Sequence, residues 1–294
     1  MSLFRPYKYR DRPEADAGAL KKNRFYVFWE IIFRKFWRLV TLNIIYFLVT
    51  LPMLLYFYYT ANGFFASYLG DNYVDLLPGV GFIAAMVSDI PQVLYIPLLV
   101  ISVILYGPIR MGMTHVYRNY TREEHAWISD VWSKALENWK HGILFGVLDF
   151  LITILLVNNI IGGFTSNNNG VAAMLMASRY LSILLLILLA FVRHYSYLIS
   201  VCVVLPARAI IKNSLLFVVM GLGRNILATA ACLVIWLLSL FTLPLISVVC
   251  LPLLTYSLCG FATAYICYPT VKKYIIVPAM RQQTEQAPDD SKNE

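Results

Sequence analysis

Apolar segments of about 20 residues recur along the whole chain, and this feature constrains the fold more than any other. A segment of that length is what an α-helix needs to cross the hydrocarbon core of a bilayer. The chain has 294 residues, of which 60% are apolar and only 14% are charged, whereas about a quarter of a soluble domain is charged. Backbone groups inside a bilayer must pair within their own segment. We therefore predict an all-α, polytopic helical membrane protein.

Six spans are predicted from these segments and from the breakers between them. Glycine and proline interrupt residues 60–91, and a Gly/Asn-rich turn follows the third span. The predicted spans are roughly 38–59, 93–116, 142–162, 173–203, 225–245 and 247–268. We expect one membrane domain over residues 22–275, a flexible cytoplasmic tail over 1–21 and a disordered cytoplasmic tail over 276–294.

Positive charge is distributed unevenly between the two sides of these spans. Of the 24 Lys and Arg residues, only Arg179 falls on the side opposite the termini. Loops rich in Lys and Arg stay in the cytoplasm, so both termini are predicted to be cytoplasmic. The same bias explains the net charge of +8 by attraction to anionic lipid. Membrane lipids are therefore expected partners, and nucleic acid is not.

Two segments place aromatic side chains at helical spacing, with Lys and Arg mostly on the other face. The segments are residues 25–37 and 127–139, and 206–223 is a third, less charged juxtamembrane segment. The aromatic residues are Trp29, Phe33 and Trp37 in the first and Trp127, Trp132 and Trp139 in the second. Helices of this kind lie flat in the headgroup layer. We predict cytoplasmic interfacial helices that either anchor the protein or dock a partner protein.

The start of the second interfacial helix has two candidate caps. Thr121 with Glu124 three residues later has the spacing of a capping box. Ser129-Asp130 offers a later cap.

Three charged residues, Arg110, Asp149 and Arg193, fall inside predicted spans. A lone charge there costs several kcal/mol, so such residues usually pair or line a watery cavity. Our hypothesis is that Asp149 pairs with Arg110 or Arg193 inside the bundle. The pair then either forms a polar cavity or proton-sensitive site, or fixes helix packing. Alternatively, the arginine side chains extend to the cytoplasmic surface.

Motifs for metal, phosphate or nucleophile chemistry are missing from the sequence. The four histidines have no metal-ligand spacing, and the five cysteines fit small buried apolar residues. No Gly-rich phosphate loop and no GxSxG motif occurs. We expect no metal, no cofactor and no enzymatic activity.

Residues 29–52, 107–125 and 130–143 resemble the YesL-like bacterial membrane proteins, a domain family of unknown function. The shared features are Leu51-Pro52, Gly107-Pro108, the charged turn from Arg122 to Glu124, and Asn138-Trp139-Lys140. Residues 53–106 form a longer interval between the first two features than family members have. The resemblance implies a location in the bacterial plasma membrane, and it supplies no catalytic or binding residues.

Three functions are compatible with these features. The leading prediction, which the resemblance implies, is a non-enzymatic accessory subunit of a carbohydrate ABC importer that contacts its permease subunits. The charged residues within the spans favour a small independent transporter or channel with a polar site near Arg110, Asp149 and Arg193. A membrane-bound enzyme acting on a lipid or glycan is a third, without a convergent catalytic set. A central cavity holding the three charges would favour the transporter, and a tightly packed core would favour the subunit.

Overall fold

Helices form all the regular secondary structure in the part of the chain that the computed structural model describes, residues 23–69, 92–162, 169–241 and 249–280. Six of these helices are long and apolar enough to cross a membrane. They are α2 (Phe36–Leu69), α5 (Gln92–Thr121), α7 (Trp139–Gly162), α8 (Asn169–Cys202), α10 (Leu222–Phe241) and a last helix made of η1 (Leu251–Thr255), α12 (Tyr256–Val271) and η2 (Lys272–Ile276). The predicted all-α membrane fold with six spans is confirmed.

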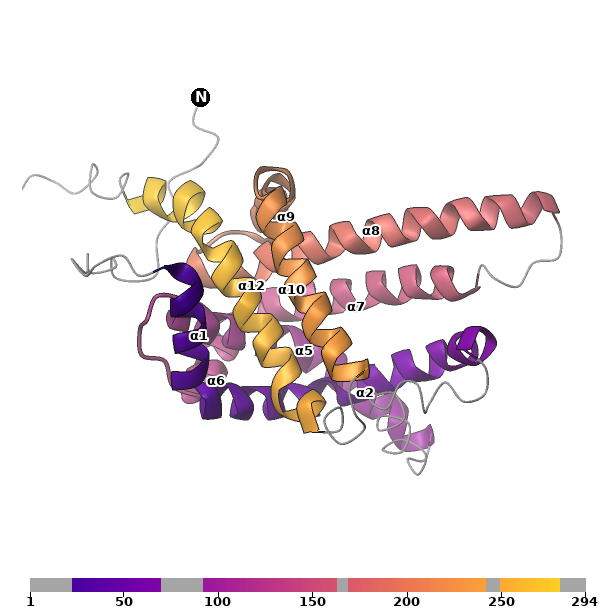
Figure 1. Cartoon of the computed structure of the whole chain (residues 1–294), viewed down its shortest axis with the longest axis horizontal. Helices are drawn as coiled ribbons and strands as arrows, with labels where there is room; N and C mark the ends of the chain where they lie inside the picture. The colour runs from indigo at the N-terminus through magenta and orange to yellow at the C-terminus, as the bar shows by residue number, and fades with distance from the viewer. Residues whose placement is uncertain (1–22, 70–91, 163–168, 242–248, 281–294) are drawn as a thin grey trace, which may run out of the picture.

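In the described part of the chain, three shorter helices connect or precede the spans. They are α1 (Arg24–Arg34), α6 (Ser129–Glu137) and α9 (Ala207–Met220). Because successive spans alternate in direction, all three lie at the end of the bundle where Lys and Arg are concentrated, which we call the basic end. Figure 1 shows α1 and α6 together beside the start of α2, and α9 between the ends of α8 and α10.

Several predicted boundaries differ from the observed helices. Helix α2 continues through Gly63 to Leu69, beyond the predicted end at residue 59, because a single glycine inside a helix costs only about 1 kcal/mol. The rest of the predicted breaker segment, residues 70–91, lies outside the described residues, as do 1–22, 163–168 and 242–248. The last helix continues to residue 280, so the predicted tail does not begin at 276.

The first interfacial helix is shorter than predicted. Helix α1 ends at Arg34, and Lys35 forms a turn in which its amide donates to the carbonyl of Ile31 (2.9 Å). Phe36 and Trp37 therefore belong to α2 and not to the interfacial helix. The turn lets α1 pack on the last helix, where the Phe28 ring stacks on Phe261 with 5.4 Å between ring centroids.

The capping box predicted at Thr121 is wrong. Thr121 is the last residue of α5, and its hydroxyl donates to the carbonyl of Tyr117 (3.0 Å). The later candidate, Ser129-Asp130, does not cap α6 either, because the N-cap residue is Ile128 and no side chain bonds the first amides of the helix. The Asp130 carboxylate instead accepts the amide of Trp127, which precedes the helix (2.8 Å).

Helix α5 is the centre of the bundle, because it contacts α2, α6, α7, α8 and α12. Glycine permits its closest approach to α7. A Cβ atom on Gly107 would lie 1.8 Å from the carbonyl oxygen of Gly142, and one on Gly146 would lie 2.8 Å from the Cα of Gly107. Backbones of membrane helices approach this closely only where both residues are small.

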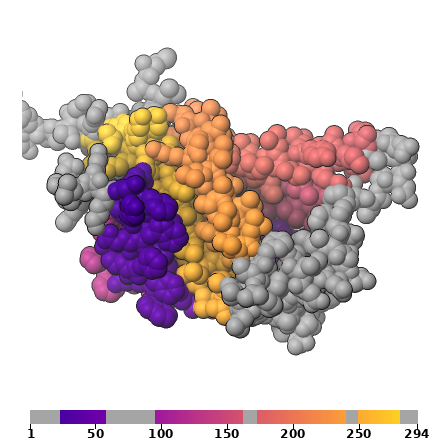
Figure 2. Space-filling model, in the orientation of Figure 1, coloured from indigo at the N-terminus to yellow at the C-terminus, as the bar shows by residue number. Residues whose placement is uncertain are grey.

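Helix α12 crosses the bundle in front of α5 and packs beside α10 (Figure 1). In the space-filling view its surface lies between that of the chain's first helices and that of α10 (Figure 2). The wide π-turn η1 at its start interrupts the regular helical bonds. The fully buried Asn43 of α2 compensates, since its amide donates to the Leu251 carbonyl (3.1 Å) and its oxygen accepts the Ser257 amide (2.7 Å). One side chain thus joins the first span to the last.

Replacing Gly107 by alanine is expected to destabilise the bundle, because the new methyl group would overlap the Gly142 backbone. Overpacking of this kind costs about 1–3 kcal/mol. Thermal unfolding in a mild detergent measures the effect. Gly223→Ala is the matched control, since its Cβ would have no neighbour within 4 Å. Equal unfolding temperatures for the two variants would contradict the close approach of α5 and α7.

Candidate functional site

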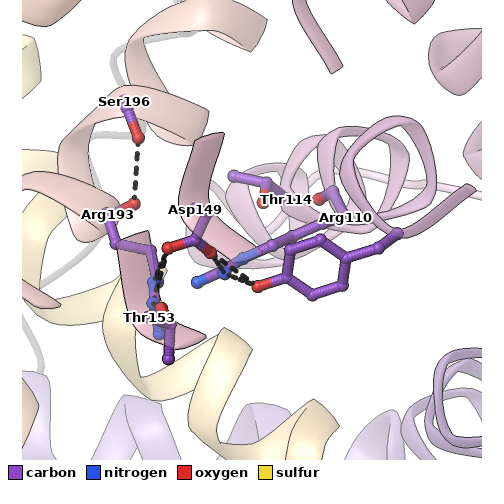
Figure 3. Close-up of polar contacts among 7 residues, drawn as sticks. Arg110, Thr114, Asp149, Thr153, Arg193 and Ser196 are labelled. Atoms are coloured by element: carbon purple, nitrogen blue, oxygen red, sulfur yellow. Dashed lines mark hydrogen bonds and ion pairs between the residues drawn. The ribbon is translucent and has the colours of Figure 1, made fainter. Parts of the chain in front are cut away.

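The Asp149 carboxylate lies between two arginines, each on a different neighbouring helix (Figure 3). Its Oδ1 atom accepts hydrogen bonds from Nε (2.8 Å) and Nη2 (2.5 Å) of Arg193 on α8. Its Oδ2 atom lies 3.4 Å from Nη1 of Arg110 on α5 and accepts the Tyr106 hydroxyl at 2.9 Å. The structure therefore brings together all three charged residues that the sequence places inside spans.

Neighbouring side chains hold both guanidinium groups in place. Arg193 also donates from Nη2 to the Thr153 hydroxyl (3.0 Å), one turn beyond Asp149 on α7. Arg110 donates to the Tyr106 hydroxyl, and its guanidinium carbon lies 4.4 Å from the centroid of the Tyr197 ring. A cation over an aromatic face is stabilised, more strongly where water is excluded. Both arginines are thus fixed inside the bundle and do not extend to its surface.

The two arginine contacts with Asp149 are unequal. Arg193 makes two short bonds to one carboxylate oxygen, whereas Arg110 makes one long contact to the other. Two guanidinium groups share one carboxylate, so the cluster carries an excess of one positive charge. An uncompensated charge in an apolar layer attracts an anion or requires water.

The cluster lies in the wall of a cavity of about 400 Å³ between the spans. Its lining is largely aromatic and hydroxyl-bearing. It includes Tyr46, Thr50, Tyr106, Thr114, Tyr197, Thr229, Trp236, Tyr256 and Thr263. Clefts of a few hundred Å³ with an apolar wall and a few convergent polar groups are the usual form of small-molecule sites.

Several polar residues of this cavity were not predicted from the sequence. Tyr106 precedes Arg110 by one helical turn, and His194 follows Arg193 directly, so adjacency to a charged residue within a span was the available signal. His194 hydrogen-bonds with the Thr229 hydroxyl (3.0 Å) and so links α8 to α10. Tyr197 gave no signal, because a tyrosine in a membrane helix is ordinary.

A second buried polar network lies closer to the basic end. Arg118 is 1% exposed, and it donates to the Val201 carbonyl (2.9 Å) and to the Asn119 side-chain oxygen (2.9 Å). His115 lies beside them, with Nε2 at 3.1 Å from the Asn119 amide nitrogen. Arg118 follows the predicted second span, 93–116, and was counted only among the Lys and Arg residues on the side of the termini. The hydrogen bond from Arg118 to Val201 links α5 to α8 on the side of the cavity that is nearer the basic end.

The six aromatic residues predicted to be interfacial are all exposed, between 45% and 78%. They are Trp29 and Phe33 in α1, Trp37 at the start of α2, Trp127 before α6, Trp132 in α6, and Trp139 at the start of α7. They lie at the basic end, away from the charge cluster. The two aromatic segments are joined there, since the Arg38 guanidinium lies 5.1 Å from the Trp127 ring centroid and donates to the Ala126 carbonyl (3.1 Å).

Lys35, in the turn between α1 and α2, lies at the same end. Its ammonium nitrogen is 5.5 Å from the centroid of the Tyr120 ring. Partial burial lowers the pKa of Lys35, and repulsion from Arg38 and Arg34 adds to the effect.

Neither the cysteines nor a metal-binding group adds a further site in the part of the chain that the structure describes. The five cysteines are unbridged, and Cys232 and Cys259 line the cavity. Within residues 23–69, 92–162, 169–241 and 249–280, no group of three His, Cys, Asp or Glu residues could hold a metal ion.

Comparison with known proteins gives no relative from which a role could be transferred. No protein-family model matches the chain, and no curated protein or solved structure matches it. The geometry of the site is therefore the basis for a functional proposal.

Neutralising the carboxylate in Asp149→Asn is expected to lower the free energy of unfolding by about 3–5 kcal/mol, because it leaves two arginines whose side chains are only 23% and 26% exposed without a counter-charge. Thermal unfolding and membrane abundance measure the effect. Glu137→Gln removes an exposed carboxylate paired with Lys134 (2.6 Å) and should cost less than about 1 kcal/mol. A stable and abundant Asp149→Asn protein would rule out a structural role for the cluster.

Proposed function

We propose that this protein is a non-enzymatic transporter or channel for a small organic anion, with its solute site in the cavity beside Arg110, Asp149 and Arg193. The supporting observation is the cavity of about 400 Å³ in whose wall two arginines face a single carboxylate. A core built only for packing would bury these charges without adjoining space. The cavity therefore favours a solute pathway over a purely structural pair.

Arg110 is the group best placed to bind the solute. Arg193 is engaged by Asp149 and Thr153, whereas Arg110 makes only one long contact with the carboxylate. Among the described residues, no hydrogen-bond partner is found for Nε and Nη2 of Arg110. These donors are suited to a carboxylate or phosphate, which guanidinium groups bind in a fork geometry. The aromatic lining would contact the apolar part of the anion.

We also propose which membrane contains the protein and how the protein is oriented in it. The positive-inside rule places the basic end, and with it both termini, in the cytoplasm. The resemblance to YesL-like proteins supports a bacterial plasma membrane. The solute cavity would then lie near the middle of the bilayer, as sites in secondary transporters do.

Binding can be tested with the purified protein in detergent and three anions: benzoate, succinate and phenyl phosphate. We expect at least one of them, but not its neutral amide or phenol analogue, to raise the unfolding temperature. Arg110→Gln should weaken that binding about tenfold to hundredfold, because a hydrogen bond to a charged group contributes about 1.5–3 kcal/mol.

Lys140→Gln is the matched control, since it removes an exposed cation of α7 outside the cavity. Its response to the anions should equal that of the wild type. Equal responses from Arg110→Gln and the wild type would contradict the proposed site. Uptake of the bound anion into proteoliposomes then distinguishes transport from binding alone.

An accessory subunit of a carbohydrate ABC importer is the alternative, and one observation favours it. The exposed aromatic residues of α1 and α6 form a surface at the basic end that could dock a partner protein as well as lipid. Aromatic residues are enriched in protein interfaces.

A pull-down of the tagged protein from its native membranes in mild detergent tests this alternative. Stoichiometric recovery of importer permease subunits, lost in Trp29→Ala/Trp132→Ala, is the expected result for a subunit that docks through α1 and α6. Recovery of the protein alone would contradict the accessory-subunit alternative and favour the independent transporter.

A further inference from the structure

Helix α9 carries a third surface, which is separate from both the cavity and the aromatic residues of the basic end. Arg208 and Lys212 lie one helical turn apart on its exposed face, and Leu215, Leu216 and Val219 continue the same face. The opposite face is buried against the bundle through Ile210, Asn213, Ser214, Phe217 and Val218. The exposed face is therefore cationic in its first half and apolar in its second.

This face borders a shallow, open hollow, and α9 lines it with Arg208, Ile211, Lys212, Leu215, Leu216 and Val219. In the part of the chain that the structure describes, no acidic side chain pairs with Arg208 or Lys212. The positive end of the helix dipole lies close to Arg208 and adds to the attraction for an anion.

The apolar half of this face continues onto a membrane-spanning helix. Beyond Val219 and Met220 the chain turns at Gly221 and enters α10, where Leu222, Ile226 and Leu227 are 50%, 55% and 58% exposed. A ligand that placed an anionic group at Arg208 and Lys212 could thus extend an apolar chain along α9 toward the lipid-facing side of α10.

We infer that this face of α9 is a binding site for an anionic phospholipid. The phosphate would lie between Arg208 and Lys212, and an acyl chain would follow Leu215 and Val219 toward Leu222. Clusters of cations beside a membrane span attract anionic headgroups in this way. The acidic C-terminal segment of the chain, residues 281–294, is a weaker candidate, because it contains no large apolar side chain to cover this face.

The test compares two lipids with identical acyl chains and different headgroup charge. The full-length protein is delipidated in a neutral detergent, and its unfolding temperature is measured with added phosphatidylglycerol or phosphatidylcholine. We expect phosphatidylglycerol to raise the unfolding temperature by several degrees more than phosphatidylcholine. Inorganic phosphate at the same concentration should have no effect, because it lacks the acyl chain.

Variants locate the effect on α9. The double variant Arg208→Gln/Lys212→Gln should lose the difference between the two lipids, and Arg208→Lys/Lys212→Arg should keep it. Lys140→Gln, which removes an exposed cation elsewhere, should also keep it. Equal stabilisation by both lipids would overturn the inference. So would a preference for phosphatidylglycerol that persists in the Arg208→Gln/Lys212→Gln protein.

Discussion

The ion pair between Asp149 and Arg193 is the interaction on which the arrangement of the bundle depends. A carboxylate in the middle of an apolar helix must be compensated, and its two short bonds to Arg193 fix the rotation of α7 against α8. The bonds from Tyr106 and Arg110 fix α5 against both. These polar groups face one another inside the bundle, so the remaining faces of the same helices can be apolar. Leu151, Leu155 and Leu184 are exposed residues on such faces.

Close backbone packing makes this cluster possible. Gly107 is adjacent to Tyr106, and Gly146 lies three residues before Asp149, so the tightest approach of α5 and α7 is beside the charges. A larger residue at either glycine would separate the helices and lengthen the contacts of Tyr106 and Arg110 with the carboxylate. Asn43 has the corresponding role between the first and last spans, where it bonds backbone groups at the π-turn. Close packing at small residues and hydrogen bonds from single polar side chains thus hold the helices together, whereas the hydrophobic effect does so in water-soluble proteins.

The proposed functions occupy different parts of the molecule. The cavity has an excess positive charge, and the Arg118 network joins α5 to α8 nearer the basic end. The aromatic residues of α1 and α6 lie at that end, and the exposed face with Arg208 and Lys212 lies on α9. A solute, a partner protein and a lipid could therefore bind at separate places on the protein.

The sequence by itself determined the class of fold, the number of spans, the presence of three charges inside them and the exposure of six aromatic residues. These properties follow from composition and length, because a bilayer admits only apolar helices and makes isolated charges costly. Only the tertiary structure decided that Arg193 bonds Asp149 more closely than Arg110 does, that Tyr106 and Tyr197 complete the cluster, that Arg118 is buried and that a cavity adjoins the charges. The physical reason is that lipid-facing and core-facing positions of a membrane helix are both apolar. Periodicity therefore says little about which face packs inward, and helix rotation and approach are settled by contacts between residues far apart in the chain.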